Sequence, residues 1–150
     1  YQRSKTGALF VSATSAGAIA SGQSPKPWAS LGAFLGEAYQ VADDIRDVLG
    51  DIAMLGKPVG QDKLNERPSS AQALGLDGAI AHFDSLIKQA GDSIPECACR
   101  DMLKQLVLME SQRLVPKSMC EDYRKRAVTA KPAKTRASLR NGAQQQQIIQ

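Results

Sequence analysis

The clearest structural pattern in this 150-residue chain is the stretch Leu31-Gly-Ala-Phe-Leu-Gly-Glu-Ala-Tyr-Gln-Val-Ala-Asp-Asp-Ile-Arg-Asp-Val-Leu49. Its apolar residues recur every three or four positions, which is the period of an amphipathic helix. These residues are Leu31, Phe34, Leu35, Ala38, Val41, Ala42, Ile45, Val48 and Leu49. We therefore expect a long helix, ending near Gly50, that buries this apolar stripe.

The opposite side of this helix is polar. At one residue per 100°, Gln40, Asp43, Asp44 and Asp47 fall within an arc of about 100°. Three carboxylates on one face repel one another unless water or a cation lies between them. Oxygen ligands at this density suit a hard divalent ion such as Mg²⁺. A solvated polar face without a metal is an equally ordinary interpretation of the same pattern.

The rest of the chain also has helical periodicity, and no alternating pattern is long enough to predict a strand. Gly75 and Pro95 separate the later segments. The predicted helices cover residues 5–21, about 28–50, 71–75, 77–91 and 98–114. The predicted fold class is all-α.

Small residues predict close packing of the first two helices. Residues 5–21 are rich in Ala, Gly, Ser and Thr, which allow helix axes to approach closely in a crowded bundle. In the second helix, Gly32 and Gly36 continue the polar face toward the N-terminus. We expect these two glycines to leave open space above that face.

Composition and charge define a body and a tail. The chain is 43% hydrophobic and 23% charged, as expected of one globular domain or part of one. After Pro116 the sequence becomes basic and of low complexity, and it closes with a run of glutamines. We predict a domain over residues 1–116 and a disordered tail over residues 117–150.

The net charge of +4 belongs to this tail, so it does not indicate a nucleic-acid-binding body. Only 5% of the residues are aromatic, which argues against platforms for stacking bases. No segment has the length and apolarity of a membrane span. Cys97, Cys99 and Cys120 form no zinc-type pair, so free thiols in a reducing cytoplasm fit best.

Two lysines lie where an anion could bind. Lys5 and Thr6 open the first predicted helix, whose free backbone N–H groups and positive dipole end favour a phosphate. Lys57 lies in the loop Gly-Lys-Pro-Val-Gly, where glycines allow the backbone to approach a ligand. Each position alone is equally compatible with an ordinary solvated lysine.

Taken in order, three motifs give a specific resemblance. They are Lys5-Thr-Gly-Ala-Leu-Phe10, Tyr39-Gln-Val-Ala-Asp-Asp-Ile-Arg-Asp47 and Leu55-Gly-Lys-Pro-Val-Gly-Gln-Asp62. From about residue 3 to residue 116, the chain resembles the C-terminal half of the trans-isoprenyl (polyprenyl) diphosphate synthases. It looks most similar to bacterial enzymes of the geranylgeranyl or farnesyl type. The resemblance implies the C-terminal half of an all-α isoprenoid-synthase bundle.

The resemblance also implies roles for individual residues. Asp43, Asp44 and Asp47 match the second aspartate-rich motif, which binds Mg²⁺ bridging to the allylic diphosphate. The catalytic positions are matched by Lys5, Thr6 and Gln40, and the substrate diphosphates would be bound by Lys5, Lys57 and Arg67. Arg67 stands where many members have a lysine, and its planar guanidinium is not a simple substitute for an ammonium group.

The implied activity is the head-to-tail condensation of isopentenyl diphosphate with an allylic diphosphate, by a cytoplasmic transferase that forms homodimers. The first aspartate-rich motif of this family has no counterpart in the chain, so we expect the chain alone to be inactive. A catalytically inactive truncated or regulatory homologue is the alternative. A purely structural helical adaptor would need none of these charged residues.

Overall fold

The computed structural model describes residues 2–55 and 70–129, and within these ranges it contains helices and no strand. The elements are α1 (Gln2–Ala20), a short 3-10 helix η1 (Lys26–Trp28), α2 (Ala29–Leu55), α4 (Ser70–Asp92), α5 (Arg100–Leu114) and α6 (Lys117–Thr129). The predicted all-α class is confirmed. None of these helices is long and apolar enough to cross a membrane.

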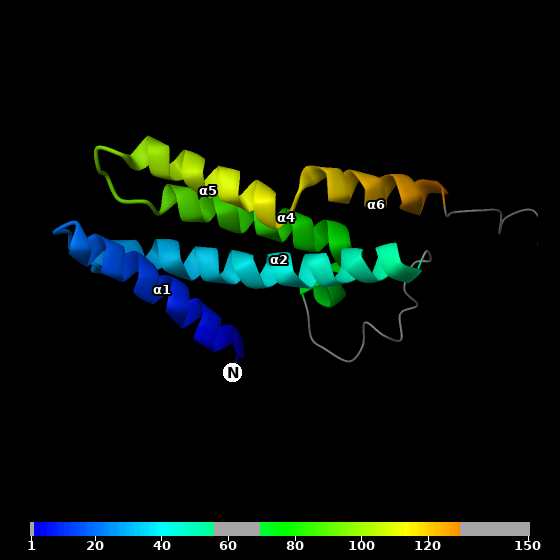
Figure 1. Ribbon diagram of the computed structural model, residues 1–150, viewed down its shortest axis with the longest axis horizontal. Helices are drawn as coiled ribbons and strands as arrows, with labels where there is room; N and C mark the ends of the chain where they lie inside the picture. Colours follow the sequence, from blue (N-terminus) through cyan, green and yellow to red (C-terminus); the bar gives the residue numbers. More distant parts are fainter. Residues whose placement is uncertain (1, 56–69, 130–150) are drawn as a thin grey trace, which may run out of the picture.

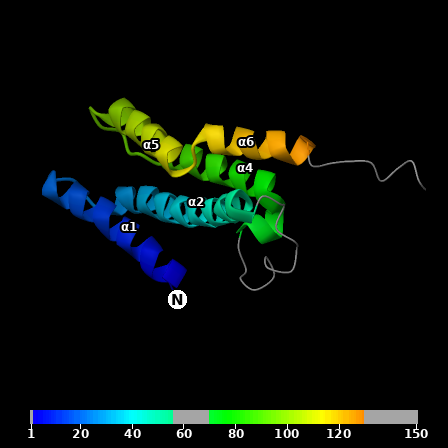
Figure 2. The ribbon, with the colours of Figure 1, turned by 45° about the vertical axis from the view of Figure 1, so that its right-hand side comes forward.

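Helix α2 lies at the centre of the arrangement. Helix α1 lies on one side of it, and α4, with α5 and α6, lies on the other (Figures 1 and 2). The apolar stripe of α2 packs against α4, and Ile45 at its centre is completely buried. The main core consists of Ala38, Val41, Ala42, Ile45 and Leu49 from α2, Leu76, Ala79, Ile80, Phe83, Leu86 and Ile87 from α4, and Val115 and Cys120.

A second, smaller cluster holds the connection between α4 and α5 to the beginning of α2. Its buried members are Leu31, Ala90 and Ile94, and Trp28 and Leu103 pack against them. Both clusters therefore use the same face of α2. This explains why the opposite face can remain polar.

The first two helices cross on glycines. A Cβ atom placed on Gly32 would lie 2.6 Å from the Thr14 Oγ1 atom, and one on Gly36 would lie 3.0 Å from the Gly7 Cα atom. The expectation of open space above Gly32 and Gly36 is therefore wrong, because α1 covers both residues. Helix α1 fills that space, because its small residues allow the close packing that the sequence predicts.

The sequence predicts helix ends at Gly75 and near Gly50, and the structure confirms the first but not the second. Gly75 has φ 69° and ψ 169°, so it breaks α4 as predicted. Helix α2 continues past Gly50, the predicted end, to Leu55. A single interior glycine costs about 1 kcal/mol relative to alanine, and no proline follows it within the helix to enforce a stop.

The prediction of a disordered tail is wrong for its first part, because Lys117–Thr129 forms α6. The segment has too little apolar surface to fold alone, but it packs on the body. Its Cys120 side chain is buried in the main core, and the Arg124 Nε atom lies 3.1 Å from the Asp77 Oδ1 atom of α4. Residues 130–150 lie outside the described residues, so the prediction of disorder for that part of the tail stays a prediction.

Candidate functional site

The acidic residues lie on the outward face of α2. Asp43 and Asp47 are exposed and Asp44 is half-buried, while Ile45 between them points into the core. Gln40 lies one turn before Asp44 on the same face and is also half-buried. Because α4 occupies the apolar side, these polar side chains are presented away from the main core.

The sequence reasoning missed Arg46 as part of this face. Its Nη2 atom donates to Asp43 Oδ1 at 2.9 Å, and its guanidinium carbon lies 5.9 Å from the centre of the Tyr39 ring. The Tyr39 ring lies 5.6 Å from that of Phe10 on α1. Helical spacing predicts the contacts of Arg46 with Asp43, three residues away, and with Tyr39, seven residues away. The contact between Tyr39 and Phe10 connects α1 to the acidic face.

The acidic face has the right donor type for Mg²⁺ but not a closed metal cage. In residues 2–55 and 70–129, no group of three or more His, Cys, Asp or Glu side chains is arranged to hold a metal ion. Three carboxylates at this spacing nevertheless fit an ion that keeps several of its waters. The exposed Arg46–Asp43 pair is worth at most about 1 kcal/mol, so a metal ion can displace it at little cost.

The start of α1 lies on the side of α2 that carries Gln40. Gly7 contacts Gly36, Lys5 and Thr6 immediately precede Gly7, and Gln40 follows Gly36 by one turn on the same face. Toward its N-terminus α1 diverges from α2 (Figure 2). Lys5 is exposed and Thr6 is half-buried. Lys5 and Thr6 therefore lie within one turn of the point where α1 crosses α2 at Gly36.

The remaining two predicted site residues, Lys57 and Arg67, lie outside the described residues. Their assignment to diphosphate binding stays a prediction.

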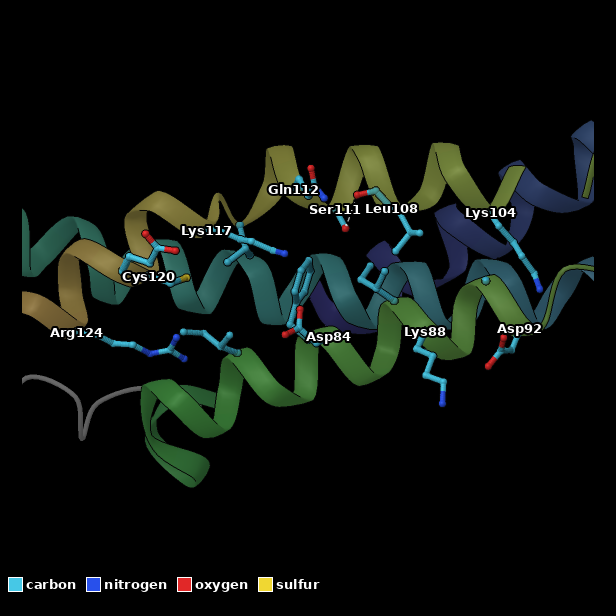
Figure 3. Close-up of a pocket in the computed structure, with 16 residues that line it drawn as sticks. Asp84, Lys88, Asp92, Lys104, Leu108, Ser111, Gln112, Lys117, Cys120 and Arg124 are labelled. Atoms are coloured by element: carbon cyan, nitrogen blue, oxygen red, sulfur yellow. Dashed lines mark hydrogen bonds between the residues drawn. The ribbon is translucent and has the colours of Figure 1, made fainter. Parts of the chain in front are cut away.

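A cavity of about 500 Å³ lies elsewhere, between α4, α5 and α6 (Figure 3). Its walls are apolar residues such as Phe83 and Leu108, and its charged lining includes Lys88, Lys104 and Arg124. None of the predicted site residues lines it. The cavity is therefore distinct from the acidic face of α2.

The fold and the acidic face together define an all-α protein in which the helix bearing the carboxylates is also the central packing helix. The chain belongs to the polyprenyl synthetase family, whose model matches residues 1–103. The match covers α1, η1, α2, α4 and the beginning of α5, and every predicted site residue lies within it. The family resemblance inferred from the three motifs is confirmed.

Individual relatives agree with this assignment. The chain is 47% identical over 116 residues to the geranylgeranyl diphosphate synthase of Cereibacter sphaeroides, a match that covers 77% of this chain and 40% of that protein. A geranylgeranyl diphosphate synthase of Rhodobacter capsulatus is 42% identical over 115 residues, with the same two coverages. The farnesyl diphosphate synthase of Escherichia coli is 36% identical over 100 residues, which cover 64% of this chain and 33% of that enzyme.

The chain thus spans about two fifths of the length of the first two of these curated relatives. No solved structure matches it.

Proposed function

We propose that this chain is the diphosphate-binding part of a prenyltransferase that condenses isopentenyl diphosphate head-to-tail with an allylic diphosphate, of the geranylgeranyl or farnesyl diphosphate synthase type. The observation that carries the proposal is the contact between Gly7 and Gly36. Gly7 directly follows Lys5 and Thr6, and Gly36 precedes Gln40 by one turn, which supports a site shared by these residues and the aspartates. The names of the relatives support the same reaction class.

The proposed role of α1 is to bind the diphosphate. Its first N–H groups have no partner within the helix, and the helix dipole favours negative charge at this end. The Lys5 ammonium and the Thr6 hydroxyl can add donors to the same oxygens. The amide of Gln40 would lie beside the allylic chain.

Asp43, Asp44 and Asp47 are proposed as the metal-binding side chains. Bound Mg²⁺ would neutralise the charge that develops on the departing diphosphate. The carboxylates would act as metal ligands and not as general acids or bases. Asp43 would exchange its contact with Arg46 for one with the ion, which leaves Arg46 near the ligand as an additional cation.

The remaining assignments complete the proposal. Lys57 and Arg67 would contribute positive charge to the diphosphate groups. The complete protein would act in the cytoplasm as a homodimer without a nucleic-acid partner. The free thiols Cys97, Cys99 and Cys120 support a reducing compartment.

A chimera tests the proposed function. The matching region of the Cereibacter sphaeroides geranylgeranyl diphosphate synthase is replaced by residues 1–116 of this chain. We expect Mg²⁺-dependent product from labelled isopentenyl diphosphate and an allylic diphosphate. A chimera that is folded by circular dichroism and binds the allylic diphosphate but forms no product would instead support the inactive homologue. Loss of both binding and turnover in a folded chimera would contradict the assignment of the site.

A further inference from the structure

The connection between α4 and α5 is a well-anchored turn. Ile94 is buried in the second cluster, with 1% of its surface exposed. On the other side, Arg100 pairs with the carboxylate of Glu96, and its Nη2 atom donates to the Asp92 carbonyl at 3.3 Å. The chain between these anchors is therefore held in a defined conformation.

This turn brings two cysteines together. The Sγ atoms of Cys97 and Cys99 lie 3.9 Å apart. The N–H of Arg100 donates to the Cys97 carbonyl at 3.1 Å, and the N–H of Leu103 donates to the Cys99 carbonyl at 3.0 Å. These bonds fix the backbone on which both thiols are carried. Cys97 is half-buried and Cys99 is exposed, so a small reagent can reach the pair.

We propose that Cys97 and Cys99 form a redox-active dithiol that closes reversibly to an intrachain disulfide by exchange with a small disulfide such as oxidised glutathione. Two residues of chain span at most about 7 Å between Cα atoms, which is the upper limit for a disulfide. The short sulfur–sulfur distance shows that the side chains also face each other. Ring closure then needs only a local movement of the turn.

The reaction proceeds in two exchange steps. The thiolate of Cys97 attacks a sulfur of oxidised glutathione, forming a mixed disulfide and releasing one glutathione thiolate. Cys99 then loses its proton to solvent, and its sulfur attacks the Cys97 sulfur and releases the second glutathione. The two cysteines are oxidised together, and one molecule of oxidised glutathione is reduced to two of glutathione.

The order of attack follows from the environment of Cys99. The hydrogen bond with Cys97, followed by the charge of Cys97, raises the pKa of the Cys99 thiol. In the dithiol this disfavours Cys99 as the first attacking thiolate, which leaves it the resolving role. Ring closure should accelerate as the pH rises, because the resolving step also uses a thiolate. A disulfide so exposed belongs to the labile class that thiols readily reduce. Cys120 is buried on α6 and takes no part.

Glutathione redox buffers test the proposal on the full chain. Mass spectrometry of the digested protein should find the peptide with Cys97 and Cys99 lighter by two hydrogens, at an extent independent of protein concentration. Dithiothreitol should restore the original mass. In Cys97→Ser or Cys99→Ser, the remaining cysteine of the pair should stop at a mixed disulfide with glutathione. Cys120→Ser is the matched control and should close the ring like the parent chain.

The anchored turn gives a second measurement that does not depend on any variant. Urea should lower the equilibrium constant for ring closure several-fold, because it releases the turn that holds the thiols together. Equal closure in urea would overturn the role of the turn. Accumulation of two glutathiones on the pair, or of disulfides between chains, would overturn the proposal itself. None of these measurements depends on prenyltransferase activity.

Discussion

The Thr14 Oγ1 atom of α1 lies 2.6 Å from the point where a Cβ on Gly32 of α2 would stand. The Val11 Cα atom is equally close to that point, and the Phe10 carbonyl oxygen is 2.7 Å from it. Two of these three atoms belong to the α1 backbone and cannot move away independently. The absence of a side chain at Gly32 therefore sets how closely α1 approaches α2, the helix that carries the acidic face.

Replacing this glycine should loosen the crossing. In Gly32→Ala, overpacking should lower the free energy of unfolding by about 1–3 kcal/mol, reduced by about 1 kcal/mol of gained helix propensity. The measurement is urea denaturation followed by far-UV circular dichroism. Gly17→Ala is the matched control, since nothing lies within 4 Å of a Cβ at Gly17 in α1. That control should be neutral or stabilising, and equal losses in both variants would contradict the packing argument.

The metal assignment predicts a loss of activity without a loss of stability. In the active chimera, Asp43→Asn should reduce Mg²⁺-dependent turnover at least about a hundredfold, because charge neutralisation by a metal is worth several kcal/mol. The free energy of unfolding should change by less than about 1 kcal/mol, since the lost Arg46 pair is exposed.

Glu37→Gln is the control for that experiment. Glu37 lies on the same helix, is exposed, and its Oε1 atom is 3.4 Å from the His82 Nε2 atom of α4. The Glu37→Gln substitution removes the same charge as Asp43→Asn, at a position with no proposed ligand role. If Glu37→Gln impaired turnover as much as Asp43→Asn, the effect would be one of net charge and not of metal binding.

The helices were predictable because their periodicity and their breaks are local properties. The apolar stripe through Ile45 specifies which face of α2 is buried, and Gly75 specifies a break because its φ of 69° suits glycine. The three ordered motifs likewise identified the family before any geometry was known. Local sequence also contained the spacing of Arg46 from Asp43, although its significance was visible only in the structure.

Tertiary contacts account for what the sequence reasoning missed. On an isolated helix, Gly32 and Gly36 predict open space above the polar face. Only the path of α1 shows that both glycines are covered. The sequence of residues 117–129 predicts disorder, because this segment cannot form a core of its own. They fold against a core that the preceding helices supply, through Cys120 above all.

Burial of Cys120 predicts a loss of stability at alkaline pH. Desolvation raises the pKa of this thiol above its ordinary value of 9.0 in the folded chain. Above that pH the unfolded chain releases the proton while the folded chain keeps it, so the unfolded state binds fewer protons and stability falls as the pH rises. The decline should continue up to the raised pKa. Urea denaturation across this range should show a weaker decline in Cys120→Ala, and an unchanged slope would contradict the assignment.

The docking of α6 can be separated from the folding of the body. In Cys120→Asp a carboxylate would have to enter the main core, where an unpaired charge is strongly disfavoured. We expect α6 to detach, because the exposed Arg124–Asp77 pair is worth at most about 1 kcal/mol and Tyr123, which also packs on the main core, is only partly buried. Trypsin should then cleave at Arg124 and Lys125 much faster, while the α2–α4 core stays protected from hydrogen exchange.

Met119→Asp introduces the same charge at the neighbouring position, where 39% of the side chain is exposed, and should leave cleavage nearly unchanged. Rapid cleavage of α6 in the parent chain itself would show that the helix does not dock.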